Sequence, residues 1–138
     1  MTTVKVFFYG LFMDSALLES KGIIAESCQP ASLDGYALRI AQRATLEKAD
    51  SKRVHGIVMS LDENDLHRLY SEPSVADYMP QRVVLKLNDG NEVAALCYIL
   101  PMPVSGGRNR EYASALAAAA RRIGLPADYV GEIETWAN

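Results

Sequence analysis

The sequence has 138 residues, 49% of them hydrophobic, which suits one globular domain spanning residues 1–138. Its net charge of -3 and its scattered lysines and arginines argue against nucleic acid as a partner. No apolar run approaches the roughly 18 residues of a membrane span, and the N-terminal run Val6–Phe8 is too short for the core of a signal peptide. We therefore expect a cytoplasmic protein with no membrane partner.

The chain opens with the pattern of a strand, a tight turn and a short helix. Val4–Tyr9 is rich in β-branched and aromatic residues and stops at Gly10, which predicts a strand that ends in a turn. Met13–Ser20 predicts a short helix, with Asp14 or Ser15 as its N-cap. A strand-turn-helix unit is therefore expected to begin the fold.

Four further segments have the composition of strands. Ala31–Ile40 alternates partly, Arg53–Leu61 contains an apolar run, and Gln81–Leu87 alternates cleanly between apolar and polar residues. Asp89-Gly90 separates the last of these from the apolar segment Val93–Tyr98, and both turn residues tolerate positive φ. The last two strands are therefore expected to form an antiparallel hairpin.

Two helices follow from capping and composition. Asp62–Tyr70 begins with a polar cap and an acidic first turn, and Pro73 prevents it from continuing. Asn109–Ile123 is rich in alanine, places its larger apolar residues on one face, and is followed by Gly124. Residues 101–107 contain two prolines and two glycines and are expected to form a loop. Together these elements predict an α+β fold whose sheet is mostly antiparallel.

Several chemistries have no motif in this sequence. It lacks the Gly-x-Ser-x-Gly, His-Glu-x-x-His and Cys-x-x-Cys patterns and a phosphate loop ending in Gly-Lys-Ser/Thr. His55 lies within an apolar strand and His67 on a polar helix face, which favours packed or surface roles. Cys28 and Cys97 lie far apart and are expected to be reduced, partly buried thiols. We therefore expect no metal and no cofactor.

Two features remain as candidates for function. The first strand runs into the turn Tyr9–Met13, and a carboxylate, Glu72, stands at the end of a short helix just before Pro73. Alone, the first is typical of an ordinary turn and the second of a solvated charge.

These two features gain weight from the residues around them. The first part of the set is Phe8-Tyr9-Gly10-Leu11-Phe12-Met13, Gly35-Tyr36, Leu38, Val54-His55-Gly56-Ile57-Val58, Leu69, Glu72 and Tyr78. The second part is Tyr98-Ile99-Leu100, Tyr112, Gly124-Leu125-Pro126 and Tyr129. In its order and spacing, the set resembles the gamma-glutamylcyclotransferase-like family over nearly the whole chain.

The resemblance implies a small barrel-like sheet with short helices and a C-terminal helix, and an end cavity that holds a gamma-glutamyl substrate. It places Glu72 at the position of the family's acid/base glutamate. The residues that it assigns to substrate binding are Tyr9, Gly10, Leu11 and Phe12 of the first-strand loop and the cavity tyrosines Tyr78, Tyr98 and Tyr112. Leu11 departs from the family, where a small Ser or Thr is common, so a backbone amide contact survives and a hydroxyl contact does not.

The implied reaction needs no nucleophile from the protein. The substrate's own α-amine attacks its γ-carbonyl, giving 5-oxoproline and a free amine, and one carboxyl group can move both protons. Backbone amides after Tyr9 would stabilise the developing oxyanion or bind the substrate carboxylate, and the sequence leaves both roles open.

Three alternatives stay open. The same fold could serve a non-catalytic small-molecule-binding or interaction protein. An amidohydrolase would release glutamate in place of 5-oxoproline. The chain could be a monomer or a homodimer, with Trp136 and the alanine-rich helix as a possible contact surface.

Overall fold

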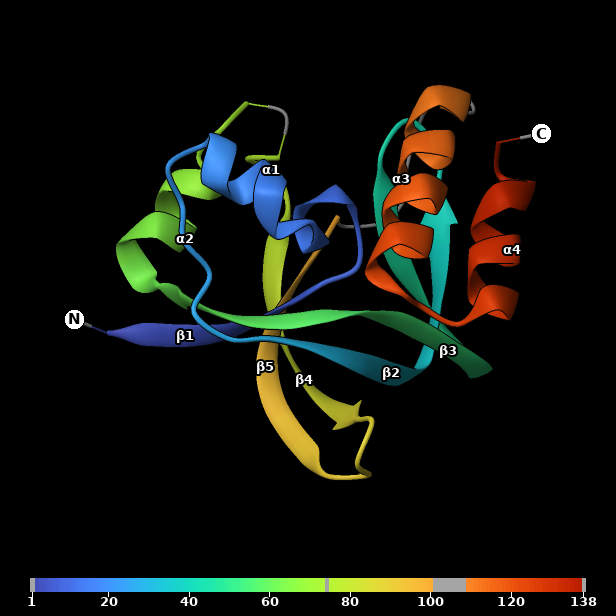
Figure 1. Ribbon diagram of the computed structural model, residues 1–138, viewed down its shortest axis with the longest axis horizontal. Coiled ribbons are helices and arrows are strands. Elements are labelled where there is room, and N and C mark those ends of the chain that lie inside the picture. Colours follow the sequence, from blue (N-terminus) through green and yellow to red (C-terminus); the bar gives the residue numbers. More distant parts are fainter. Residues whose placement is uncertain (1, 74, 101–108, 138) are drawn as a thin grey trace.

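A computed structural model describes residues 2–73, 75–100 and 109–137, and its strands form a closed barrel (Figure 1). The strands are β1 (Thr3–Phe8), β2 (Cys28–Ile40), β3 (Ala44–Asp62), β4 (Met79–Leu87) and β5 (Glu92–Ile99). The helices are the 3₁₀ turn η1 (Leu11–Met13), α1 (Ser15–Ser20), α2 (Glu63–Leu69), α3 (Arg110–Ile123) and α4 (Ala127–Thr135). The predicted α+β fold with a barrel-like, mostly antiparallel sheet is confirmed.

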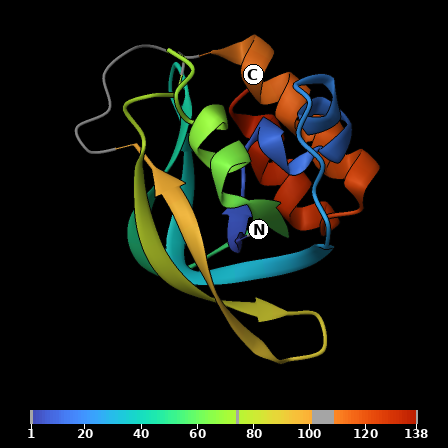
Figure 2. The same cartoon turned by 90° about the vertical axis from the view of Figure 1, so that its left-hand side faces the viewer.

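The barrel has the strand order β1-β3-β2-β4-β5 and closes through β1. This short strand pairs antiparallel with β3 along its whole length and parallel with β5 at Val6 and Phe7. Figures 1 and 2 show the helices gathered over one end of the barrel and the β4–β5 hairpin reaching out beyond the other. The C-terminal end of β1 therefore leads directly beneath the helices.

β3 begins at Ala44, well before the predicted start at Arg53, so this part of the prediction was wrong. Its first half pairs with Tyr36–Ile40 of β2, and the register shifts at Gly35, whose φ is +86°. The segment 47–52 is polar and mostly exposed, so it carries no apolar alternation. The pairing with β2 therefore decides this part of the strand, and the local pattern does not.

The predicted helix caps are present. Asp14 accepts a hydrogen bond from the N–H of Ala16 (3.0 Å) at the start of α1, and Asp62 accepts one from Asn64 (2.8 Å) at the start of α2. Asn109 caps α3, which ends at Gly124 in the left-handed conformation (φ +95°).

α4 was not predicted. Pro126 precedes it, and its buried residues Tyr129, Val130 and Ile133 all lie among the core residues. Gly131 lies inside the helix and lowers its intrinsic propensity, so the sequence pattern was weak. Figure 1 shows α4 beside α3, which indicates that tertiary packing stabilises it.

The two thiols differ from one another. Cys97 is buried on β5, whereas Cys28 is exposed at the start of β2, so the expectation of two partly buried thiols was wrong for Cys28.

The expected loop 101–107 lies outside the described residues. Among the residues that the structure describes, no helix is both long and apolar enough to cross a membrane.

Substitutions at two glycines should test the packing around β1. A Cβ at Gly56 of β3 would overlap the carbonyl oxygen of Phe8 and press on the Phe7 ring. Gly56→Ala should therefore lower the free energy of unfolding by about 2–3 kcal/mol. A Cβ at Gly131 in α4 meets nothing within 4 Å. Gly131→Ala should raise that free energy by about 0.5–1 kcal/mol, since alanine favours the helix.

Urea unfolding of both variants and the unsubstituted chain measures these differences. A Gly56→Ala variant as stable as the parent would contradict the close approach of β3 to β1. A destabilised Gly131→Ala variant would contradict the open surroundings of α4.

Candidate functional site

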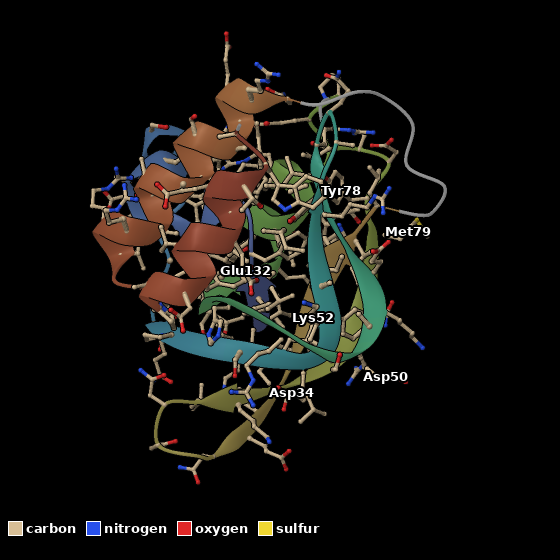
Figure 3. All side chains as sticks on the ribbon, turned by 90° about the vertical axis from the view of Figure 1, so that its right-hand side faces the viewer. Asp34, Asp50, Lys52, Tyr78, Met79 and Glu132 are labelled. Carbon is tan, nitrogen blue, oxygen red and sulfur yellow. The ribbon has the colours of Figure 1, made fainter. Side chains whose placement is uncertain are left out.

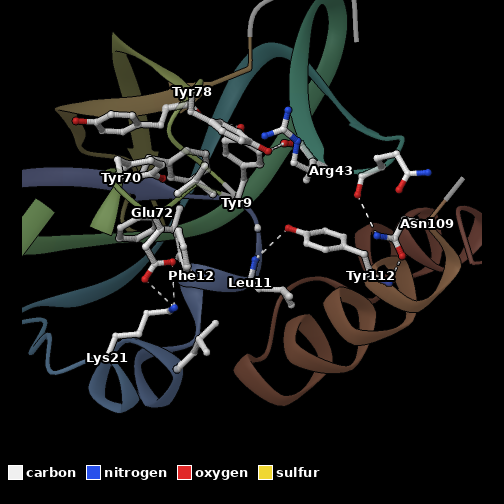
Figure 4. Close-up of a pocket in the computed structure, with 18 residues that line it drawn as sticks. Tyr9, Leu11, Phe12, Lys21, Arg43, Tyr70, Glu72, Tyr78, Asn109 and Tyr112 are labelled. Carbon is white, nitrogen blue, oxygen red and sulfur yellow. Dashed lines mark hydrogen bonds and ion pairs between the residues drawn. The ribbon is translucent and has the colours of Figure 1, made fainter. Parts of the chain in front are cut away.

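A cavity of about 380 Å³ lies where the end of β1 meets the helices, a size suited to a small molecule. All eight residues that the resemblance assigned to catalysis or binding line it (Figure 4). The full lining is Phe7, Phe8, Tyr9, Gly10, Leu11, Phe12, Leu17, Lys21, Gln42, Arg43, Ala44, Tyr70, Glu72, Val75, Tyr78, Tyr98, Asn109 and Tyr112. The fold thus brings the eight residues together, and the role of each stays a prediction.

One wall of the cavity is aromatic. Tyr70 stacks on Tyr98 with ring centroids 3.8 Å apart and an angle of 9° between the planes. The ring of Phe12 meets Tyr70 edge-on at 5.9 Å, and the hydroxyl of Tyr9 donates to the backbone carbonyl of Tyr98 (2.6 Å). Tyr70 was not predicted as a site residue, although it is the C-cap of α2 and lies two positions before Glu72. These contacts give the cavity a stiff apolar surface.

The tyrosines of this wall are neutral at ordinary pH. Burial raises the pKa of Tyr9 and of Tyr70 well above the ordinary value of a tyrosine, and nearby ionisable groups such as Cys97 add to the shift. Burial also raises the pKa of Tyr78, Tyr98 and Tyr112. Their hydroxyls therefore act as hydrogen-bond donors and acceptors, and they add no charge to the site.

The turn after β1 brings its backbone close to a tyrosine hydroxyl. The N–H of Leu11 donates to Oη of Tyr112 over 3.4 Å, a long bond that a ligand could replace. A Cβ at Gly10 would lie only 2.7 Å from the same oxygen. Gly10 has φ -107°, so close approach and not backbone conformation calls for glycine there.

Glu72 lies in the bend beyond α2, which ends at Leu69, and it forms an ion pair with Lys21 at the end of α1. Nζ of Lys21 lies 2.9 Å from Oε1 and 3.2 Å from Oε2 of the carboxylate. The side chains are 30% and 36% exposed, so the pair contributes little to stability. Lys21 was missed, because its partner is 51 positions away and no local pattern links the two.

The opposite rim of the cavity is polar as well. The guanidinium of Arg43 forms two hydrogen bonds with Asp77 (2.7 and 2.8 Å) and lies 5.5 Å from the centre of the Tyr78 ring. Asn109 donates to the carbonyl of Gln42 (3.0 Å) and so ties the start of α3 to the turn between β2 and β3. Neither Arg43 nor Asn109 was predicted as a site residue.

His55 lies elsewhere, packed edge-on against Tyr129 at 5.0 Å. The pKa of this imidazole is lowered, mainly by burial and further by the charge of Arg53. Within the described residues, no three His, Cys, Asp or Glu side chains are grouped as metal ligands would be.

Comparison with known proteins places the chain in a family. The sequence profile of the AIG2-like family matches residues 53–133. This chain belongs to the AIG2-like family. A search of curated proteins found no match. The resemblance to gamma-glutamylcyclotransferase-like proteins is confirmed by this family match together with the solved structures described next.

Solved structures of low sequence identity share the fold. One titled gamma-glutamyl cyclotransferase has a TM-score of 0.79 and 18% identity, and the match covers 96% of this chain and 87% of that chain. An uncharacterized protein from Homo sapiens also gives 0.79 and 18%, with coverage of 97% and 88%. YkqA from Bacillus subtilis gives 0.80 and 19%, and this AIG2-like chain spans 55% of its length. At such identities the likeness shows the fold alone.

The buried tyrosines make stability depend on alkaline pH. A group whose pKa is raised by folding stabilises the protein below its unfolded pKa, and this contribution is lost as the pH rises further. Since the ordinary tyrosine pKa is 10.0, the free energy of unfolding should fall above about pH 10. Tyr70→Phe should make this fall shallower, by roughly 1 kcal/mol per pH unit near pH 11. Urea unfolding at several pH values between 8 and about 11.5 gives both slopes. Identical slopes would contradict a buried, neutral Tyr70.

Proposed function

We propose that this chain is a gamma-glutamylcyclotransferase-like enzyme that acts on a small-molecule gamma-glutamyl amide. In this reaction the substrate cyclises to 5-oxoproline and releases a free amine, with Glu72 as the general acid/base. The observation that supports the proposal most directly is the shared cavity of the Glu72 carboxylate, the Leu11 N–H and the aromatic wall. A proton acceptor, a backbone donor and a water-excluding surface thus face one small volume.

The proposed steps start from a substrate folded so that its α-nitrogen faces its γ-carbonyl carbon. Glu72 takes a proton from the α-ammonium, and the freed amine attacks the γ-carbon and forms the five-membered ring. The carbonyl oxygen becomes negatively charged and needs a hydrogen-bond donor. Glu72 then gives its proton to the leaving nitrogen as the bond between carbon and that nitrogen breaks. The ring nitrogen still carries one proton more than in 5-oxoproline, and the regenerated Glu72 carboxylate takes this second proton and passes it to the released amine, which leaves as an ammonium ion.

The aromatic wall supports this reaction in two ways. Phe12, Tyr70 and Tyr98 form a stiff surface that holds the flexible glutamyl chain folded, and this lowers the entropic cost of ring closure. The same surface keeps water away from the γ-carbonyl, which favours attack by the amine over hydrolysis. The product therefore distinguishes this proposal from an amidohydrolase, which would yield glutamate.

Glu72→Gln keeps the shape of the side chain and removes its proton transfer. We expect turnover to fall on the order of 100-fold or more while the fold is kept. The assay incubates the protein with gamma-glutamyl amino acids, gamma-glutamyl amines and glutathione, and detects 5-oxoproline by mass spectrometry. Glu92→Gln is the matched control, since Glu92 is exposed on the β4–β5 hairpin outside the cavity.

Near-normal turnover in Glu72→Gln would remove Glu72 from the mechanism. No product from the unsubstituted, folded chain across the whole panel would favour the alternative function, a non-catalytic binding or interaction protein.

Substitutions at Gly10 and Leu11 distinguish substrate binding by the backbone of the turn from binding by the side chain of Leu11. Gly10→Val adds atoms where a Cβ already lies 2.7 Å from Oη of Tyr112, so the valine should obstruct the cavity. We expect KM to rise on the order of 10-fold, whereas Leu11→Ala should change it less, because the N–H of Leu11 remains. Steady-state kinetics on one substrate measures both values. Equal effects of the two substitutions would count against the binding role of the turn.

A further inference from the structure

Lys21 and Glu72 present opposite charges side by side at the wall of the cavity (Figure 4). Both oxygens of the carboxylate lie within 3.2 Å of Nζ of Lys21. Their side chains are partly exposed, so a ligand in the cavity can reach both charges. The two side chains come from different elements, since Lys21 is the C-cap of α1 and Glu72 follows α2.

A gamma-glutamyl compound carries the complementary charges on one carbon atom. Its α-ammonium and its α-carboxylate are neighbours, as are Glu72 and Lys21 in the cavity. When the ammonium lies next to Glu72, the carboxylate can lie next to Lys21, and the four charges alternate around a ring. Each charge then has two opposite neighbours at about 3–4 Å, which favours this orientation over its reverse.

The geometry points to Lys21 as the residue that binds the α-carboxylate of the substrate while Glu72 holds the α-ammonium. Lys21 thereby selects gamma-glutamyl compounds whose α-carboxylate is free. This inference rests on the proposed function for its class of substrate. It adds a residue from α1 to the recognition of the substrate, although the sequence suggested no such role.

Among the described residues that line the cavity, Arg43 is the cation besides Lys21, and it is less suited to this role. Two nitrogens of its guanidinium already donate to the two oxygens of Asp77. Glu72 must lie beside the α-ammonium to take its proton, and the α-carboxylate is bonded to the same carbon atom. The cation beside the carboxylate must therefore lie beside Glu72, and that cation is Lys21.

The backbone N–H of Leu11 in the turn after β1 then has a role of its own. With the α-carboxylate at Lys21, the N–H of Leu11 is left for the γ-carbonyl oxygen, whose charge grows during ring closure. Figure 4 shows the Lys21–Glu72 pair on one side of Leu11 and the ring of Tyr112 on the other. Of the two roles that the sequence left open for these amides, oxyanion stabilisation is therefore the one we infer.

The test compares two substrates on four proteins. The first substrate is gamma-glutamylethylamide, whose α-carboxylate is its single anionic group, and the second is the same compound with that carboxylate replaced by a carboxamide. The proteins are the unsubstituted chain, Lys21→Met, Lys21→Arg and the control Lys52→Met. Lys52 is an exposed lysine of β3 outside the cavity lining, and Figure 3 shows it apart from Tyr78. Cyclised product is measured by mass spectrometry, and urea unfolding confirms that each variant is folded.

We expect the unsubstituted chain and Lys52→Met to prefer the free carboxylate in kcat/KM on the order of 10-fold or more. Lys21→Met should lose this preference through a higher KM for gamma-glutamylethylamide, with little change for the carboxamide. Lys21→Arg should keep most of it, because the positive charge is kept. A merely structural Lys21 would affect both substrates alike.

A preference in Lys21→Met equal to that of the unsubstituted chain would overturn the inference. If the unsubstituted chain converts neither substrate, the proposed reaction fails, and the dissociation constants of the same two compounds decide about Lys21. Calorimetry should then give the same loss of preference in Lys21→Met. Equal preference in the two proteins, or no binding of either compound to the unsubstituted chain, would refute Lys21 as a carboxylate-binding residue.

Discussion

The pairing of β1 with strands on both of its sides is the constraint on which the rest of the structure depends. β1 joins β3 to β5 and so closes the barrel, and its core residues Val6, Phe7 and Phe8 are almost completely buried. A strand fixed along both edges ends at a defined point, so the turn that follows it is placed accurately. The cavity is therefore built at the end of a strand that is paired on both sides, where a backbone donor can be held in place without a special side chain.

The cavity combines a stiff apolar wall with few charges. The tyrosines are neutral at ordinary pH, and burial raises the pKa of Tyr9 and Tyr70 further, while the Lys21–Glu72 pair has no net charge. A zwitterionic head with an uncharged chain matches this distribution, since its charges meet the ion pair and its methylene groups meet the aromatic rings. An anionic ligand without an ammonium group would share Lys21 with the Glu72 carboxylate, which leaves one negative charge at the pair uncompensated.

Local signals predicted the parts of this fold that local interactions decide. The Asp89-Gly90 hairpin and the caps Asp14 and Asp62 each follow from neighbouring residues, and all three are present. The first half of β3 and the helix α4 depend on pairing and packing with distant segments, so the sequence pattern did not reveal them. Lys21, Tyr70 and Asn109 were missed as site residues for the same reason. Glu72 and the first-strand turn were found through the family resemblance, and their own local pattern would have indicated only a bend and a turn.

The kind of contact at each position shows which substitutions the turn after β1 can accept. Gly10 is restricted because a Cβ would meet Oη of Tyr112, and Gly56 because a Cβ would meet the backbone of β1. Leu11, in contrast, directs its N–H to the cavity, and every residue except proline has an N–H. Leu11, at a position where the resemblance implies a small Ser or Thr, therefore alters the surface of the turn and keeps its donor. The proposed reaction requires backbone positions, one carboxylate and an apolar wall, and these leave most of the remaining side chains free to change.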